Sequence, residues 1–192
     1  MDKAYEPQKI ESEIYQKWQK TKLFEPSSDP TLEPYTIIAP PPNANGSLHI
    51  GHAVFVTLQD IMARYQRLKG KAVLWLPGYD HAGFETQVVY DKKLEKEGKS
   101  RFKIERDTLY QEMYSFTKSH IETMRHQLQS LGASMDWQRE IFTLDERVVK
   151  IVYRTFKDLY DDGLVYRGER PINWCTKHQT SLAELEVSYE QR

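Results

Sequence analysis

The sequence PPPNANGSLHIGH occupies residues 40–52 and joins a rigid proline run to a histidine-glycine-histidine cluster. Residues 35–39, just before it, are β-branched and mostly apolar, which is typical of a buried strand. After it, apolar residues recur at helical spacing from Ile50 to Leu68, and Gly70 offers a helix end. The sequence therefore predicts a strand, a glycine-bearing loop and a helix whose N-terminal N–H groups and positive dipole end suit a phosphate.

Two histidines stand three residues apart at this helix start. His49 and His52 therefore lie on one face, where both can donate hydrogen bonds to phosphate oxygens. Gly51 between them has no side chain, so a base or ribose can approach the backbone closely. The alternatives are a metal site, for which no third ligand stands at helical spacing, and two solvated histidines. On these residues alone, a nucleotide site and an ordinary helix start both stay open.

The rest of the chain shows alternating strand and helix patterns. Strands are expected over 72–76, 164–166 and 172–175, and helices over 85–97, over 107–131, and from a capping box at 143–146 to Gly163. This order predicts a Rossmann-like α/β fold, with a mainly parallel sheet and helices on both faces. Ligands bind such sheets beyond the C-terminal ends of the strands, where the loops 40–46 and 77–83 both fall.

A helical arm is expected before the first strand. Pro7 suits a first helical turn, and four apolar residues form a stripe that should pack on the main domain: Ile10, Ile14, Trp18 and Phe24. Residues 26–30 have the composition of a loop that separates this arm from the strand.

Composition and charge narrow the class of protein. The 192 residues carry 27 Lys and Arg against 28 Asp and Glu, so the net charge of -1 gives no bulk attraction for RNA. A single cysteine excludes an internal disulfide framework. The chain shows no apolar run long enough for a membrane span, and its first residues lack a signal-peptide pattern. We therefore expect a soluble cytoplasmic protein.

Several segments resemble one enzyme family. The run His49-Ile50-Gly51-His52 matches all four letters of the HIGH signature of class I aminoacyl-tRNA synthetases. The triple proline followed by Asn43 resembles the valine-activating branch of that family rather than its isoleucine and leucine branches. So do the segments 58–65, 73–83, 86–87, 131–137, 163–168 and 173–175, and the resemblance runs from about Tyr5 to the last residue. Two departures concern the pocket: Tyr79 stands where the family usually has threonine, and Phe84-Glu85 replaces a small apolar pair.

The resemblance implies a reaction and a set of site residues. ATP, with Mg²⁺, and L-valine would form valyl-adenylate, which is then joined to tRNA(Val) without a protein nucleophile. His49 and His52 would be the catalytic pair, stabilising charge that grows on the phosphates. ATP would contact Asn45, Gly46, His49, Gly51 and His52, and the amino acid would contact Pro41, Asn43 and Asp80.

The loop after the second strand carries its own alternatives. The resemblance gives Asp80 the substrate ammonium, with the backbone carbonyl of Pro41 beside it. On its residue type alone, Asp80 could equally cap a helix or order the loop. His81 could orient this loop, approach the substrate or be structural.

The resemblance also implies a division of the chain. An N-terminal helical arm would cover 1–30, the first half of a Rossmann-type catalytic domain 31–175, and the start of an inserted editing region 176–192. The family's lysine-containing second signature, its editing module and its anticodon-binding helices do not occur in the 192 residues. We therefore expect an N-terminal catalytic fragment, monomeric and at most weakly active alone. The alternative is a non-catalytic module derived from a synthetase, which keeps the nucleotide site and binds a partner.

Cys175 and His178 form a separate candidate pair. Two intervening residues are a usual spacing for half of a zinc site, and some members of the family carry a zinc knuckle in this region. The sequence offers no second pair, so we expect a structural cysteine and assign no metal ligand.

Overall fold

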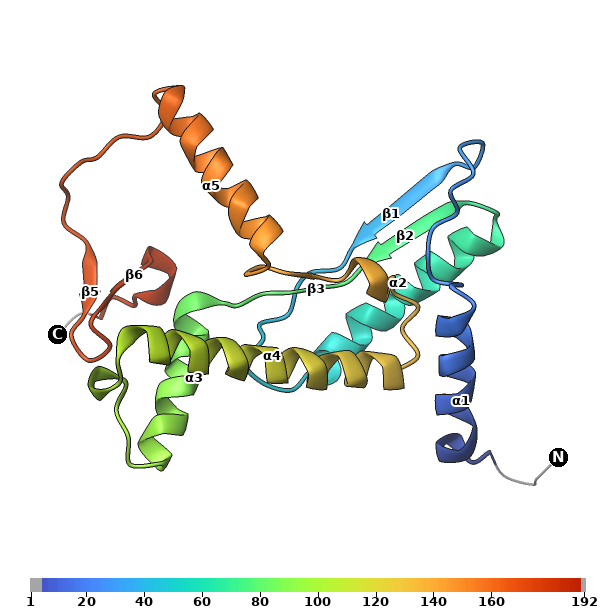
Figure 1. Cartoon of the computed structure of the whole chain (residues 1–192), viewed down its shortest axis with the longest axis horizontal. Helices are drawn as coiled ribbons and strands as arrows, with labels where there is room; N and C mark the ends of the chain where they lie inside the picture. The colour runs from blue at the N-terminus through green and yellow to red at the C-terminus, as the bar shows by residue number, and fades with distance from the viewer. Residues whose placement is uncertain (1–4, 191–192) are drawn as a thin grey trace. The chain divides into compact units, whose positions relative to one another are not determined.

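The structure, a computed structural model, describes residues 5–190, which fall into two compact units that divide after Val149 (Figure 1). Residues 1–4 of the expected arm, which include most of the segment tested for a signal peptide, and residues 191–192 of the expected inserted region lie outside the described residues. The expected boundaries at residues 30 and 175 stay predictions.

The first unit contains α1 (Pro7–Lys20), β1 (Pro34–Ile38), α2 (Ile50–Leu68), β2 (Ala72–Leu76), β3 (Gly78–Tyr79), α3 (Gly83–Lys96), η1 (Arg101–Lys103), α4 (Arg106–Ser130), η2 (Trp137–Arg139), β4 (Ile141–Phe142) and the start of α5 (Glu146–Asp161).

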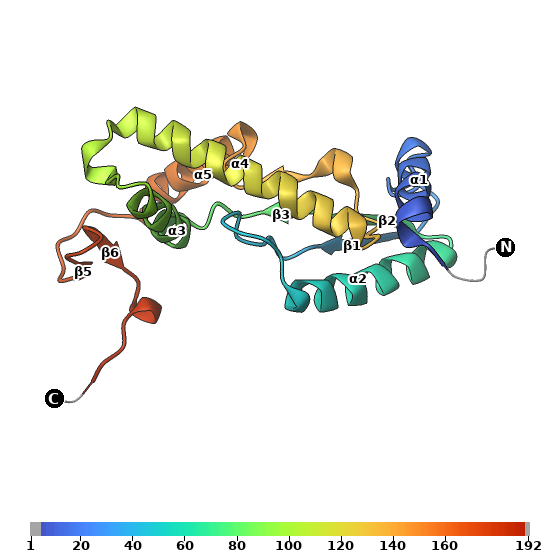
Figure 2. The same ribbon diagram turned by 90° about the horizontal axis from the view of Figure 1, so that it is seen from below.

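A parallel pair of strands forms the centre of this unit. β1 and β2 pair in register from Pro34 opposite Ala72 to Ile38 opposite Leu76, with α2 as the connection between them. Figure 2 shows the pair lying between α2 and α4. The strand pair and the two helices pack together through one hydrophobic core cluster. Its buried residues are Val56 and Ala63 of α2, Val73 and Trp75 of β2, Leu128 of α4, and Ala39, Ala133 and Met135 of the connecting segments. The predicted Rossmann-like α/β class is confirmed by this parallel arrangement of strands and helices.

Helix α2 has the bounds that its sequence predicts. It begins after His49 and ends before Gly70, whose φ of +80° is a left-handed conformation that glycine adopts without strain. Its buried face meets β2, and Gln59 accepts a hydrogen bond from the Trp75 indole N–H at 3.1 Å. Its other face exposes a row of large apolar side chains: Ile50, Val54, Leu58, Ile61, Met62, Tyr65 and Leu68.

The next two helices differ from their predicted bounds by one or two residues. α3 begins at Gly83 rather than residue 85, after Ala82 with a left-handed φ of +53°. α4 begins at Arg106, where the Glu105 carboxylate accepts hydrogen bonds from the N–H groups of Asp107 and Thr108. A second core cluster joins α4 to the strand ends: Ala44, Tyr79, Ile121, Met124 and Phe142.

The arm packs through a different face than the one predicted. Trp18 is half-buried and Phe24 is buried, as expected, but Ile10 and Ile14 are each 40% exposed, so their place in the contact was wrong. Tyr15, one residue and hence about 100° around the helix from Ile14, is buried instead. Its hydroxyl donates to the Ala133 carbonyl at 2.6 Å and accepts from the Trp137 indole at 2.8 Å. Burial raises the pKa of Tyr15 to about 12, so this hydroxyl stays a donor.

The second unit contains the remainder of α5, then β5 (Asn173–Cys175), β6 (Thr180–Leu182) and η3 (Glu184–Glu186). β5 pairs antiparallel with β6 in a hairpin, which confirms most of the strand expected over 172–175. The strand expected over 164–166 was wrong: these residues have no strand partner within residues 5–190, and Leu164 and Tyr166 are exposed. A short apolar run without a neighbouring edge cannot form a ladder.

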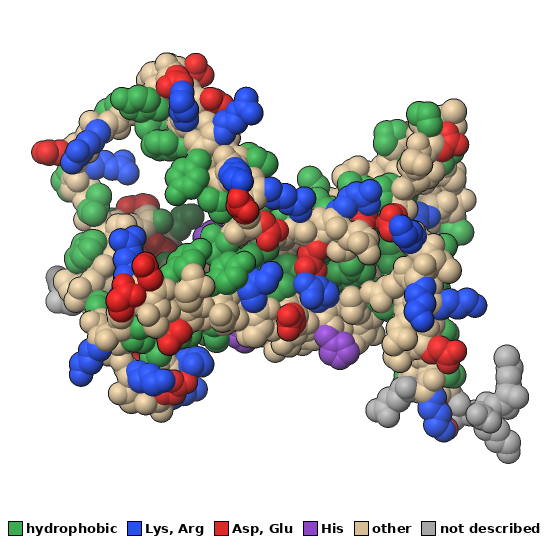
Figure 3. All heavy atoms as spheres, in the orientation of Figure 1, with side chains coloured by type: hydrophobic (Ala, Val, Ile, Leu, Met, Phe, Trp, Pro, Cys, Tyr) green, Lys and Arg blue, Asp and Glu red, His purple; other side chains and the backbone are tan. Residues whose placement is uncertain are grey.

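The surface carries charges of both signs. Figure 3 shows lysine and arginine side chains interspersed with aspartate and glutamate over the face that it displays, in keeping with the net charge of -1. None of the helices within residues 5–190 combines the length and the apolar character needed to span a bilayer.

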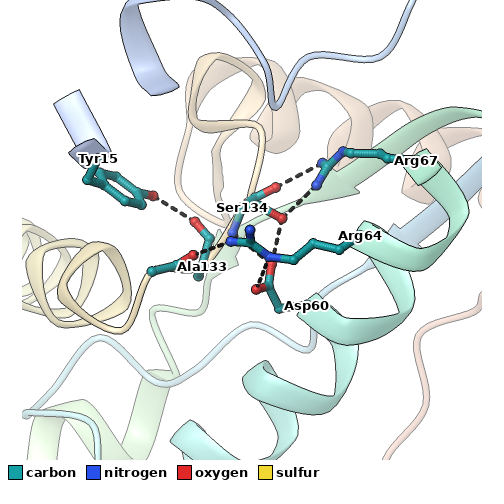
Figure 4. Close-up of polar contacts among 7 residues, drawn as sticks. Tyr15, Asp60, Arg64, Arg67, Ala133 and Ser134 are labelled. Atoms are coloured by element: carbon teal, nitrogen blue, oxygen red, sulfur yellow. Dashed lines mark hydrogen bonds and ion pairs between the residues drawn. The ribbon is translucent and has the colours of Figure 1, made fainter. Parts of the chain in front are cut away.

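A polar network ties the C-terminal half of α2 to the segment after α4 (Figure 4). The Asp60 carboxylate accepts from the Ser134 N–H at 3.0 Å, from the Ser134 hydroxyl at 2.5 Å and from Arg64 Nε at 2.6 Å. Arg64 also donates to the Gly132 carbonyl, and Arg67 donates to the carbonyl and hydroxyl of Ser134. The Asp60 carboxylate and the Ser134 hydroxyl, both close to the core, thus have hydrogen-bond partners.

Asp60→Asn should lower the free energy of unfolding by about 2 kcal/mol, because the amide loses the charge that strengthens these hydrogen bonds. Urea unfolding followed by circular dichroism measures the change. Glu33→Gln is the matched control, since Glu33 pairs with Lys71 on the surface and its side chain is 71% exposed. That control should change stability by less than about 0.5 kcal/mol, and equal effects of the two variants would contradict the role of the network.

Candidate active site

The two loops after β1 and β2 are hydrogen-bonded to each other. The Asp80 N–H donates to the Pro42 carbonyl at 2.9 Å, and the Ala44 N–H donates to the Asp80 carbonyl at 2.7 Å, so Asn43 stands opposite Asp80 in a parallel bridge. Between this bridge and the last strand pair lie residues 39–42 on one side but only 77–79 on the other. The proline run absorbs the extra residue, because prolines have no N–H to leave unpaired. The expectation that both loops meet at the C-terminal edge of the strands is confirmed.

A third segment joins the same edge. β3 pairs in parallel with β4, and the Thr143 N–H donates to the Tyr79 carbonyl at 3.1 Å. The backbones approach closely here, since a Cβ on Gly78 would stand 3.3 Å from the Ile141 carbonyl oxygen. Asn43, Asp80 and Thr143 therefore follow one another across the strand ends.

A cleft of about 500 Å³ opens over the first loop and the start of α2. This volume is in the range of sites for small ligands. The structure brings six of the sequence-predicted residues to its wall: Pro41, Asn43, Asn45, Gly46, His49 and His52. Pro40, Pro42, Ser47, Phe55 and Met124 complete the lining, whereas Gly51 and Asp80 lie beside the cleft and not in its wall.

The two histidines cap the helix that carries them. His49 is the N-cap residue of α2, and its Nδ1 accepts from the Gly51 N–H at 3.1 Å. His52 Nδ1 accepts from the His49 N–H at 3.3 Å. The ring centroids lie 4.0 Å apart. Both side chains thus satisfy N–H groups that the first turn of a helix leaves without partners.

This arrangement sets the protonation of both rings. A Nδ1 that accepts a backbone hydrogen bond carries no proton, so each neutral ring carries its proton on Nε2 and offers it as a donor. Burial, and then the proximity of His49, lowers the pKa of His52 from its ordinary value of 6.5. The lowered pKa of His52 favours its neutral form, so the helix start presents an oriented Nε2–H donor together with its dipole.

Gly51 makes this histidine geometry possible. A Cβ built on Gly51 would lie 2.9 Å from Cε1 and 3.0 Å from Nδ1 of the His49 ring. Any other residue would displace the imidazole from the first turn. The structure thus gives the missing side chain a role beside the expected approach of a ligand to the backbone.

The side chain of Thr143, which the sequence pattern placed in a helix cap, contacts Asp80 and His81 instead. Thr143 was expected to open the capping box of α5, and this was wrong: Asp145 occupies the N-cap position, where its carbonyl accepts the first helical hydrogen bonds from Val148 and Val149. The Thr143 hydroxyl instead contacts Asp80 Oδ1 at 3.2 Å, the His81 N–H at 2.9 Å and His81 Nδ1 at 2.6 Å. Asp80 Oδ1 also accepts from the Ala82 N–H, so the carboxylate does order this loop.

Tyr79, which departs from the family pattern, is buried in the second core cluster. Its hydroxyl lies near the Arg125–Glu140 ion pair, and burial, followed by the charge of Glu140, raises its pKa. The side chain therefore packs under the strand ends and leaves the cleft wall to the proline run.

Four residues outside the stretch 40–52 were not predicted to belong to this region. Phe55 stands one turn after His52 on the same helical face, a signal that spacing could have supplied. Met124 reaches the cleft from α4, and Gln127 of the same helix accepts from the Leu48 N–H at 2.9 Å. These two, like Thr143, are brought in by tertiary packing across more than sixty residues of sequence, and no local pattern marks them.

The Cys175 and His178 pair of the second unit does come together. Its sulfur and Nδ1 lie 3.2 Å apart, and the His178 N–H donates to the sulfur. Within residues 5–190, no group of three or more His, Cys, Asp or Glu residues is arranged to hold a metal ion.

Comparison with known proteins places the chain in a family. The profile described as tRNA synthetases class I (I, L, M and V) matches residues 13–192. The chain belongs to this family, and its HIGH segment, cleft and strand-end loops are the parts of the fold that the match contains.

The most similar relatives include proteins named valine--tRNA ligase. The chain is 46% identical over 190 residues to that of Dehalococcoides mccartyi strain CBDB1, 45% to that of Bacillus subtilis, and 41% over 189 residues to that of Aquifex aeolicus. These alignments cover 98–99% of the chain but 22%, 22% and 16% of the relatives. A solved structure, the ternary complex of Agrobacterium radiobacter K84 agnB2 LeuRS-tRNA-LeuAMS, superposes with a TM-score of 0.80 at 26% identity, covering 96% of this chain and 22% of that one.

His52 should titrate below pH 6.5 in NMR spectra of the folded chain and return toward that value in urea. Because the unfolded state then binds the proton more readily, His52 contributes stability that is complete above about pH 6.5 and is lost as the pH falls below it. His52→Asn, which keeps an acceptor but cannot ionise, should flatten this part of the stability profile. An identical pH dependence in both proteins would rule out the contribution of His52.

Proposed function

We propose that this chain forms the part of a valine--tRNA ligase that binds ATP and L-valine and activates valine as its adenylate. The observation that carries this proposal is the pair of histidine donors at the start of α2, in the wall of a cleft of about 500 Å³. The family membership and the valine--tRNA ligases among the relatives support the choice of reaction and amino acid.

The nucleotide has a place at the start of α2. Phosphate oxygens accept hydrogen bonds from the Nε2–H groups of His49 and His52 and benefit from the helix dipole. Asn45 and Gly46 line the same wall, and Gly51 lies behind the histidines. Mg²⁺ would enter with ATP as part of the substrate.

The amino acid has a place at the neighbouring strand end. Asp80 Oδ1 is contacted by the Ala82 N–H and the Thr143 hydroxyl and lies 3.5 Å from His81 Nδ1, whereas within the described residues the structure records no hydrogen bond to Oδ2. The Asp80 side chain is 38% exposed, so a substrate ammonium can reach this oxygen. Asn43, directly across the bridge, and Pro41 of the same cleft wall then lie beside it.

The reaction requires position and charge stabilisation. A carboxylate oxygen of valine attacks the α-phosphorus of ATP, and the bond to the bridging oxygen breaks so that pyrophosphate leaves with the electron pair. Holding both reactants at adjacent strand ends lowers the entropic part of the barrier. The histidine donors, already oriented by their Nδ1 bonds, stabilise the charge that develops on phosphate oxygens without reorganising.

The remaining steps belong to the longer relatives. The chain spans about a fifth of the length of the valine--tRNA ligases from Dehalococcoides mccartyi and Bacillus subtilis. Transfer of valine to tRNA(Val), action as a monomer and a place in the cytoplasm are therefore parts of the proposal for the whole protein.

Valine-dependent exchange of pyrophosphate into ATP tests the proposal directly. We expect slow exchange by the 192-residue chain, and NMR shifts on ATP addition that concentrate on residues 40–52. Exchange that does not respond to valine, together with ATP-induced shifts remote from this loop, would overturn the proposal.

His49→Asn should lower the exchange rate about a hundredfold, because one donor to the developing charge is lost. Asparagine keeps an oxygen near the position of Nδ1 and is a strong N-cap residue, so unfolding should change little. His49→Gln is the converse variant, since it keeps an N–H near the position of Nε2 and loses the cap. It should retain more exchange than His49→Asn despite lower stability. The reverse order would assign His49 to the helix cap alone.

Asp80→Asn should weaken L-valine binding at least tenfold and ATP binding less than about twofold, measured by calorimetry. The amide can still accept from Ala82 and Thr143, so the variant removes the charge and keeps the loop. Asp29→Asn, in a turn where Asp29 accepts from Thr31, is the matched control. Equal losses for both ligands would mean that Asp80 only orders the loop.

A further inference from the structure

The Thr143 hydroxyl lies among three polar groups at the amino-acid end of the site. It stands 2.9 Å from the His81 N–H, 2.6 Å from His81 Nδ1 and 3.2 Å from Asp80 Oδ1. Thr143 is half-buried and fixed at the end of β4 by its own N–H bond to Tyr79. Its backbone is therefore anchored to Tyr79, the residue directly before the Asp80 and His81 that its side chain contacts.

Counting donors and acceptors leaves two arrangements of these bonds, one for each His81 tautomer. A threonine hydroxyl has one proton and two acceptor lone pairs. The His81 backbone N–H can only donate, and an ionised Asp80 carboxylate can only accept, so the hydroxyl proton goes to Asp80 Oδ1 when His81 Nδ1 carries a proton and to Nδ1 when it does not. In the first arrangement, the second lone pair of the Thr143 hydroxyl faces His81 Nδ1. Nδ1 then carries a proton and donates it to this lone pair.

We propose that Thr143 is a positioning residue that passes a hydrogen bond from His81 Nδ1–H to Asp80 Oδ1, and thereby holds the Asp80 carboxylate with Oδ2 free for a substrate ammonium. His81 is then the Nδ1–H tautomer, opposite to the tautomer of His49 and His52. This inference rests on the proposed function for the ammonium, whereas the direction of the bonds rests on the distances around the hydroxyl together with the Nδ1–H tautomer.

The alternative tautomer shows why the proton on Nδ1 matters. With His81 protonated on Nε2, the hydroxyl would donate across the 2.6 Å contact to Nδ1 and face Asp80 with a lone pair. Asp80 Oδ1 would keep only the Ala82 N–H, and two acceptors would stand 3.2 Å apart. The carboxylate would rotate to relieve this contact and lose its orientation toward the ligand.

The loop itself has a second support that does not involve Asp80. The Thr86 hydroxyl donates to the His81 carbonyl at 2.6 Å from inside α3. Loss of the Thr143 hydroxyl removes the acceptor of the His81 N–H, but the Thr86 bond should hold the loop backbone, so the main effect should fall on the side chains of Asp80 and His81.

Three variants of the 192-residue chain test the proposal. Thr143→Val removes the hydroxyl at nearly constant shape, and Thr143→Ser restores it. Thr117→Val is the matched control, because that buried hydroxyl donates to the Tyr114 carbonyl within α4 and lies outside the site. Urea unfolding of each variant confirms that the comparison is made between folded proteins.

The first measurement is the tautomer of His81, read from its ring ¹⁵N shifts at a pH where the ring is neutral. Wild type, Thr143→Ser and Thr117→Val should show the proton on Nδ1, and Thr143→Val should shift it toward Nε2. A wild-type ring protonated on Nε2 would overturn the proposal without reference to any ligand.

The second measurement compares L-valine with isovalerate, which is valine without its ammonium group. The dissociation constant of isovalerate divided by that of L-valine should fall about tenfold in Thr143→Val, which corresponds to one hydrogen bond to a charged group. The ratio should return to the wild-type value in Thr143→Ser. ATP binding should stay within about twofold. An unchanged ratio in Thr143→Val would overturn the positioning role while the proposed function stands.

The two measurements separate the two claims. If wild type shows the Nδ1–H tautomer but binds valine no better than isovalerate, the proposed ammonium site fails and the role of Thr143 toward a ligand fails with it. If valine is preferred but the tautomer is Nε2–H, the function stands and the hydrogen-bond chain is wrong.

Discussion

The site depends on hydrogen bonds that continue parallel pairing beyond the ends of the strands. Asp80 is bound through both its N–H and its carbonyl to the loop after β1, while the neighbouring residue Tyr79 is bound on its other side to Thr143. Backbone N–H and carbonyl groups that would otherwise need water are thus paired across three chain segments. These backbone bonds bring together three side chains of different chemistry: the amide of Asn43, the carboxylate of Asp80 and the hydroxyl of Thr143.

Local patterns in the sequence predicted what local forces determine. The bounds of α2 follow from its apolar spacing, its capping histidine and its terminal glycine, all contained in 22 residues from His49 to Gly70. The cleft residues near the HIGH segment follow from the same stretch. Tyr15 was missed because Ile10 and Ile14 make a more apolar stripe, while packing chose the face on which a tyrosine could hydrogen-bond to Ala133.

Nonlocal contacts determined the rest. Thr143 matches a capping box in sequence, yet its hydroxyl bonds to a loop 62 and 63 residues away. Capping energies of about 1 kcal/mol are small enough for a charged partner to override, and Asp145 was available as a replacement N-cap residue. The strand expected at 164–166 failed for a related reason, since strand formation requires a neighbour that a sequence window does not contain.

The extra residue in the proline run has a consequence for insertions and deletions. Side chains alternate along extended backbone, so a shift of one residue turns each side chain to the opposite face. Deleting any one of Pro40, Pro41 and Pro42 would remove the residue by which this loop exceeds its partner, so the backbone path that brings Asn43 opposite Asp80 would have to change. The length of this low-complexity tract is thus under a stricter constraint than the identity of its members.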